Sequence, residues 1–228
     1  MPEHSCKLRR GKQQMTVTDS PHNYRLVVFD LGGVLARICH TWEEVARTTG
    51  VACGLDPNGT TPLAAFPEFD GYQAGEVTLP NYLDALSAFV GCDPADAIRM
   101  HNGILVEPYP GSEELVAELE TSGFGTGCLS NTNEPHWVDL AMNGRFPAIV
   151  RLERKMASHL VGLNKPDPAI FLLYAKEHGV QPTEIVYFDD SLANVKAANE
   201  VGYRAFRVDP SGDTVAQIRG FLAEAGVL

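Results

Sequence analysis

The feature that most constrains the fold is a series of short apolar runs that end in polar residues and alternate with helical segments. The runs "RLVVFD", "FGTGCLSNTN" and "EIVYFDD" end, in chain order, at Asp30, at Ser130 and Asn131, and at Asp189 and Asp190. Strands that alternate with helices form a parallel sheet covered by helices on both faces. We therefore predict an α/β fold with a Rossmann-like, doubly wound parallel sheet.

The helices of this part of the chain have clear start and stop signals. A helix is predicted from Ser112 to a stop at Gly123, and another begins after the cap residue Asp167 and ends at Gly179. A third follows Asp190 and stops at Gly202. The run "YRAFRV" then predicts another strand, and residues 213–225 predict a last helix.

Residues 37–107 have a different character, because they contain helical patterns and loops but no clear strand. Helices are predicted over 41–48, with Thr41 as N-cap, and over 79–90 and 94–105, whereas 51–66 is a loop rich in Gly and Pro. We predict that 37–107 is a small inserted helical cap, and that 21–36 with 108–228 is the α/β core. The polar residues 1–20 are expected to be a disordered extension without a signal peptide.

Composition excludes several classes of function. The formal net charge of −11 argues against sequence-independent nucleic-acid binding, which needs a basic face. No apolar run approaches the ~18 residues of a membrane span. Five cysteines without a C-x-x-C pair suggest reduced thiols, so we expect a cytoplasmic protein, with a monomer slightly favoured. An anionic small molecule stays compatible, since a local site can be positive in an acidic protein.

The polar strand ends predict a single site. Ligands of open α/β sheets bind at the carboxyl ends of the strands, where Asp30, Asp189 and Asp190 would meet. Carboxylates in close proximity repel one another unless a cation lies between them, and oxygen ligands of this kind suit Mg²⁺. The Ser130 hydroxyl and the Lys165 ammonium group would supply donors for phosphate oxygens.

Four motifs in the order "VVFDLGGVL", "LSNTN", "KPDPAIF" and "YFDDSLANVKAANEVG" resemble those of the haloacid dehalogenase superfamily of phosphohydrolases and dehalogenases. The resemblance extends over residues 24–210, and the order and spacing of the motifs make it specific. It indicates the subfamily with a small helical cap, and sugar-phosphate phosphatases with an "FDLGN"-type first motif are among the most similar types.

The resemblance implies a role for each site residue. Asp30 would be the nucleophile that forms an aspartyl-phosphate, with Ser130 and Asn131 holding phosphoryl oxygens and Lys165 neutralising charge. Mg²⁺ would be held by Asp30, Asp190 and the main-chain carbonyl of Gly32. Asp189 would be either another ligand or an acceptor behind the ligands. The implied reaction is Mg²⁺-dependent hydrolysis of a small phosphomonoester, with a sugar phosphate suggested by the resemblance alone.

Gly32 departs from the family pattern, because most of these phosphatases have an aspartate there that acts as general acid and base. Three explanations stay open. The substrate has a good leaving group, such as a sugar 1-phosphate or an acyl phosphate; another residue (His136, His40 or Glu44) replaces the acid; or the protein is a weak or silent phospholigand-binding protein. Hydrolytic dehalogenation is a lower-ranked alternative, since the residues around Gly32 do not resemble those of dehalogenases.

Overall fold

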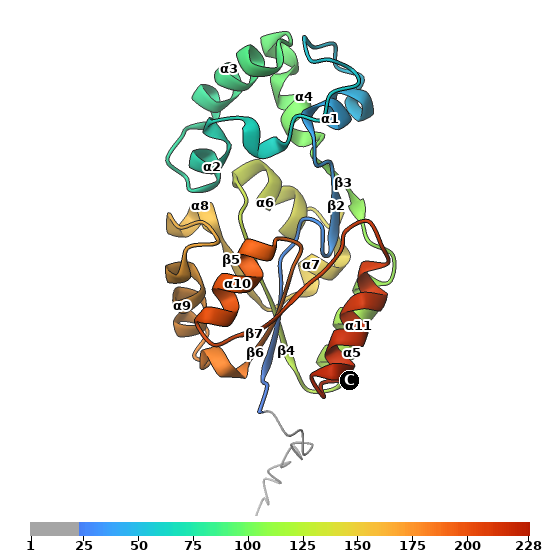
Figure 1. Cartoon of the computed structure of the whole chain (residues 1–228), viewed down its shortest axis with the longest axis vertical. Coiled ribbons are helices and arrows are strands. Elements are labelled where there is room, and N and C mark those ends of the chain that lie inside the picture. Colours follow the sequence, from blue (N-terminus) through green and yellow to red (C-terminus); the bar gives the residue numbers. More distant parts are fainter. Residues whose placement is uncertain (1–22) are drawn as a thin grey trace, which may run out of the picture.

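The protein has a central parallel sheet in the strand order β5-β4-β1-β6-β7 (Figure 1). The computed structural model describes residues 23–228, so the extension expected at 1–20 lies outside the described part. The strands are β1 (Leu26–Phe29), β4 (Gly125–Ser130), β5 (Arg154–Ala157), β6 (Ile185–Asp189) and β7 (Arg204–Arg207). β1 is in the middle, and it is fully buried because both faces of the sheet are covered.

Helices cover both faces of the sheet (Figure 1). One face packs against α5 (Ser112–Thr121), α7 (Pro147–Arg151) and α11 (Thr214–Glu224), with α6 (Glu134–Ala141) above them. The other face packs against α9 (Pro168–Glu177) and α10 (Leu192–Glu200), with α8 (Ser158–Val161) and the 3-10 helix η3 (Pro182–Glu184) beside them. The predicted fold class is confirmed. None of the helices within residues 23–228 is long and apolar enough to cross a membrane.

A second layer of helices lies above the carboxyl ends of the strands (Figure 1). It consists of α1 (Trp42–Thr49), α2 (Glu68–Gln73), α3 (Leu79–Val90) and α4 (Ala97–Asn102), with the 3-10 helices η1 (Leu63–Ala65) and η2 (Pro94–Asp96). We call this layer the cap. It has its own apolar core, which includes Trp42, Phe66, Tyr82 and Leu86, so it is stabilised independently of the sheet.

The expectation of no strand within 37–107 was wrong. β2 (Ala36–Ile38) and β3 (Leu105–Pro108) form an antiparallel pair where the chain enters and leaves the cap. The helix expected over 94–105 accordingly ends at Asn102. Both strands are too short for an alternating pattern to appear, and each pairs with a partner about 70 residues away, so local sequence carries no signal for them. We call this pair the hinge strands.

Gly127 in the middle of β4 shows how closely the core helices approach the sheet. A Cβ atom at this position would overlap both the Tyr174 hydroxyl and the Arg154 carbonyl oxygen. These two groups are hydrogen-bonded to each other at 2.8 Å, so neither can move away without losing a buried bond.

We expect Gly127→Ala to lower the free energy of unfolding by about 1–3 kcal/mol, the usual cost of overpacking a core. The matched control is Gly220→Ala on the exposed face of α11, where nothing lies within 4 Å of an added Cβ. That change should stabilise the protein by about 0.5–1 kcal/mol through helix propensity. Urea unfolding measures both; equal effects would contradict the packing described for β4.

Candidate active site

Three carboxylates meet at the carboxyl end of the sheet. β1 and β6 are aligned so that Phe29 lies beside Phe188, and the main-chain N–H of Asp30 donates to the Phe188 carbonyl at 2.8 Å. Asp30 is therefore level with Asp189, and Asp190 follows one residue later. One oxygen from each of the three carboxylates lies within 4.8 Å of the others. The structure thus brings together the three acids that the sequence predicts to meet.

Lys165 reaches this cluster from the loop before α9. Its Nζ lies 2.9 Å from Asp30 Oδ1 and 2.7 Å from Asp189 Oδ2, and it also donates to the Tyr187 hydroxyl at 3.0 Å. The ammonium group is almost fully buried. Burial alone would lower the pKa of Lys165, but Asp189 and then Asp30 outweigh it, so the pKa is raised and the lysine stays charged.

Asp189 has no oxygen left for a metal ion. Its Oδ1 accepts from the main-chain N–H of Ser191 at 2.8 Å and from Asn194 Nδ2 at 3.0 Å. Its Oδ2 accepts from Lys165 and from the hydroxyl of Tyr187. The geometry therefore favours the second of the two roles left open for Asp189, an acceptor that holds Lys165 in place.

The side chain of Asn131 binds the main chain of Lys165. The Asn131 side chain donates to the Lys165 carbonyl and accepts from the Lys165 N–H, both at 2.8 Å. Its amide is thus engaged with the protein, which makes Asn131 a positioning residue for Lys165. Ser130 is buried at the end of β4, and the register of Phe29 with Cys128 places it one residue beyond the level of Asp30.

The electrostatics of the cluster leave a place for a cation. The pKa of Asp30 is raised to about 7, because burial together with Asp189 and Asp190 outweighs the opposing effect of Lys165. Burial and Asp189 also raise the pKa of Asp190 against the opposing effects of Lys165 and His40. One lysine does not compensate three carboxylates, and a divalent cation would.

The donor set fits Mg²⁺. Within residues 23–228, the hydrogen bonds and ion pairs to the Asp30 side chain come from the Leu31 N–H at 2.7 Å and from Lys165, and both end on Oδ1. Asp30 Oδ2 is therefore the oxygen that receives no donor from these residues. The Asp30 and Asp190 carboxylates, with a main-chain carbonyl such as that of Gly32, would give the hard oxygen ligands that Mg²⁺ requires.

Glycine is present at positions 32 and 33 for different structural reasons. Gly33 has a φ of 73°, and a Cβ there would lie 2.7 Å from Asp190 Oδ2, so the chain turns directly beneath that carboxylate. A Cβ on Gly32 would lie 3.1 Å from Ile38 Cδ1 on hinge strand β2. A side chain at position 32 would therefore begin in tight contact with Ile38, which would have to shift by a few tenths of an ångström to accommodate it.

Of the three residues expected as substitutes for that acid, His136 is in the wrong place. It is buried against the cap with both ring nitrogens hydrogen-bonded to other residues. Glu44 Oε2 accepts from the main-chain N–H of His40 at 2.9 Å, so this carboxylate is engaged with the chain just before α1. Of the three candidates, this leaves the exposed His40, whose side chain acts electrostatically on Asp190.

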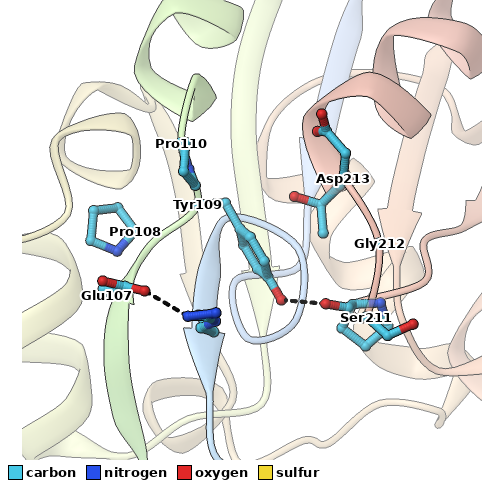
Figure 2. Close-up of a pocket in the computed structure, with 10 residues that line it drawn as sticks. Glu107, Pro108, Tyr109, Pro110, Ser211, Gly212 and Asp213 are labelled. Atoms are coloured by element: carbon cyan, nitrogen blue, oxygen red, sulfur yellow. Dashed lines mark hydrogen bonds and ion pairs between the residues drawn. The ribbon is translucent and has the colours of Figure 1, made fainter.

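A cavity of about 320 Å³ lies beside the hinge strands (Figure 2). Arg37 and Glu107, paired at 2.7 Å, form one side, and Tyr109 crosses it to donate to the Pro210 carbonyl at 3.0 Å. The start of α11 forms the other side. Asp30, Lys165 and Asp190 are not part of its lining, so this cavity is distinct from the catalytic cluster.

Tyr187 is the site residue that sequence reasoning missed. The sequence does contain a signal for it. Residues two apart on a strand share one face, and Tyr187 precedes Asp189 by two residues in "IVYFDD". Asn194 also contacts Asp189 directly, from α10.

Comparison with known proteins identifies the family. The sequence model of the haloacid dehalogenase-like hydrolases matches residues 24–202. Phosphatase MT3486 of Mycobacterium tuberculosis is 30% identical over 199 residues, which are 82% of this chain and 88% of that protein. A predicted HAD-like family hydrolase from Porphyromonas gingivalis has a structure with a TM-score of 0.69 and 28% identity, covering 88% of this chain and 98% of that one. The chain belongs to the haloacid dehalogenase-like hydrolases.

Some relatives are much longer. Acyl-CoA dehydrogenase family member 10 of Mus musculus is 25% identical over 88% of this chain, but the match spans only 19% of that protein. The shared unit is therefore the hydrolase domain.

The different surroundings of Asp189 and Asp190 lead to a prediction about metal binding. Asp190→Asn should weaken Mg²⁺ binding at least about tenfold, because it removes a ligand carboxylate. Asp189→Asn should keep most of the Mg²⁺ affinity but lower thermal stability, because it leaves the buried Lys165 with one carboxylate fewer. Calorimetric titration with Mg²⁺ and thermal unfolding measure the two effects. Loss of Mg²⁺ binding in folded Asp189→Asn would show that Asp189 is a ligand.

Proposed function

We propose that this protein is a Mg²⁺-dependent phosphatase that hydrolyses a small phosphomonoester through an aspartyl-phosphate on Asp30. The observation that carries the proposal is the asymmetry of the Asp30 carboxylate. Its Oδ1 is held by Lys165 and the Leu31 N–H, whereas no hydrogen bond or ion pair from residues 23–228 ends on Oδ2. A fixed carboxylate with one free oxygen is suited to in-line attack on phosphorus.

The residues divide the reaction between them. Asp30 Oδ2 attacks the phosphorus, the bond to the ester oxygen breaks, and the leaving oxygen takes up a proton. Water then attacks the same phosphorus, the bond to Asp30 breaks, and phosphate is released with the carboxylate restored. Lys165 and the Ser130 hydroxyl stabilise charge on the phosphoryl oxygens. Mg²⁺, held by Asp30, Asp190 and the Gly32 carbonyl, would supply further charge stabilisation for the transferring group.

The proposal agrees with what is known of the family. The relative from Mycobacterium tuberculosis is named a phosphatase and aligns with most of this chain. The cap lies above the strand ends, where it would cover the site and limit it to small substrates. A cytoplasmic location and a monomeric state stay predictions.

The absence of a carboxylate at position 32 restricts the class of substrate. Without a carboxylate at position 32, the leaving oxygen gains no proton from that position, and general acid catalysis is typically worth ~10²–10⁴-fold. Substrates whose leaving group is stable as an anion lose least. A sugar 1-phosphate or an acyl phosphate is therefore favoured over a primary alkyl phosphate.

The test is phosphate release from a panel of phosphomonoesters with Mg²⁺, with and without EDTA. We expect EDTA to abolish release, and Asp30→Asn to reduce it by at least about 10³-fold because the nucleophile is lost. No release from a folded protein that binds Mg²⁺ would favour the silent phospholigand-binding protein, whose ligand affinity would depend on Lys165. EDTA-resistant hydrolysis of a 2-haloacid would favour the dehalogenase.

A second experiment tests the missing acid. With aryl phosphates of increasing leaving-group pKa, kcat should fall by more than about 10²-fold across the series, because little proton donation assists departure. The double variant Gly32→Asp with Ile38→Ala should flatten this dependence, and more than Gly32→Asp alone, because Ile38→Ala removes the tight contact with the new side chain. A flat series for the unaltered protein would instead indicate a working acid, and His40→Ala would then identify it by restoring the slope.

A further inference from the structure

A buried pair of histidines joins the cap to the core. His101 lies at the end of α4 in the cap, and His136 lies in the first turn of α6 in the core. Their rings are parallel within 3°, with centroids 4.0 Å apart, and the two residues are 0% and 6% exposed. Neither residue has a part in the phosphatase chemistry proposed above.

The hydrogen bonds around this pair determine where the protons are. His136 Nε2 lies 2.9 Å from the His101 carbonyl, which can only accept, so Nε2 carries the proton. His136 Nδ1 then accepts from Asn133 Nδ2 at 3.3 Å. Asn133 Oδ1 accepts from the His136 main-chain N–H at 3.2 Å and from His101 Nε2 at 3.0 Å. His101 Nδ1, lacking a proton, accepts from the Tyr82 hydroxyl at 3.2 Å.

We call these four residues, Tyr82, His101, Asn133 and His136, the histidine latch. Its hydrogen bonds are complete only when both rings are neutral, because a proton on His101 Nδ1 would reverse the bond to Tyr82 and leave the hydroxyl proton of the buried Tyr82 without this acceptor. A proton on His136 Nδ1 would face the Asn133 amide, which is itself a donor. Asn133 cannot turn its oxygen toward that proton, because the oxygen already caps α6 and accepts from His101.

The charged groups around the latch do not favour a second proton. Within the described residues, no carboxylate is hydrogen-bonded to either ring. Asp139 acts on His136, but Arg145, with which it pairs at 2.5 Å, acts in the opposite direction. From the cap, Tyr72 and Tyr82 contact His101 through their rings, and Glu134, at the start of α6, acts on Tyr72.

The latch also contacts the catalytic loop. Asn133 is three residues after Ser130 and two after Asn131, whose side chain holds Lys165. Opening the cap must separate His101 from Asn133 and His136, and therefore removes the hydrogen bond from His101 to Asn133 in this loop together with the bond from His136 to the His101 carbonyl.

We propose that the histidine latch is a proton-sensitive lock that keeps the cap closed and the Ser130–Asn133 loop in place only while both rings are neutral. The inference rests on the proposed function for its catalytic consequence, but the lock itself is measured without substrate.

The direction of the pH effect follows from linkage. An open cap exposes the rings to water, where their pKa is near 6.5. In the closed protein, burial is the main cause that lowers the pKa of His136 to about 4, and burial with His136 as neighbour lowers that of His101. Between these values the open state binds more protons, so closure is complete above about pH 6.5 and weakens below it. Each histidine changes the closing equilibrium by up to about tenfold per pH unit.

The first test follows the ring nitrogens of the full chain by ¹⁵N NMR, together with amide exchange of α4 and α6, from pH 8 to pH 4.5. We expect two neutral Nε2–H rings at pH 5.5. Protection factors at the α4–α6 contact should fall by about tenfold or more between pH 6.5 and pH 5.5. Protection of α9, which is away from the cap, should stay constant. Rings that titrate near 6.5 with unchanged exchange would overturn the proposal, as would equal loss of protection in α9.

The second test uses His136→Gln, whose amide can still donate to the His101 carbonyl but cannot titrate. Its protection factors should depend on pH about tenfold less per unit than those of the unaltered protein. His178→Gln is the matched control, because His178 packs on Tyr174 in α9 and does not contact the cap. An unchanged pH dependence in His136→Gln would overturn the proposal. If that variant does not fold, the NMR titration of the unaltered protein decides alone.

Discussion

The burial of the Lys165 ammonium group between Asp30 and Asp189 is the interaction on which the rest of the site depends. A buried ammonium without a partner costs several kcal/mol, and a buried carboxylate costs as much. Each is tolerated only because the other lies within 3 Å. The pairing explains why β1 and β6 are adjacent and in register at their carboxyl ends, since a shift of one residue would move Asp189 away from Lys165.

Most polar contacts around the site orient this pairing. Asn131 fixes the lysine main chain, and Asn194, Ser191 and Tyr187 occupy the remaining positions on Asp189. Asp189 is consequently saturated by donors, whereas no hydrogen bond from another residue within 23–228 ends on the Asp190 carboxylate. Two adjacent aspartates of identical chemistry thus differ because only the first is surrounded by donors.

The sequence predicts the core better than the cap. The strand that ends at Asp30 and the helices capped by Thr41 and Asp167 have local signals, and the structure confirms them. The hinge strands and β5 have none, because no apolar run marks these segments and each is defined by its pairing with a distant strand. Which residues gather at the sheet edge follows from strand order. Strand order does not determine which of these residues bind one another. Neither the saturation of Asp189 by donors nor the burial of His136 was therefore predictable.

The absence of an acid at position 32 also has an electrostatic consequence. Asp30, Asp189 and Asp190 already repel one another enough, together with burial, to raise the pKa of Asp30 to about 7. A carboxylate at position 32 would be a fourth acid beside one lysine, and it would raise that pKa further. Ile38 instead places apolar packing there and attaches the first hinge strand to the catalytic turn. Glycine at position 32 thus limits the charge of the site, and the Ile38 contact connects the first hinge strand to the turn after Asp30.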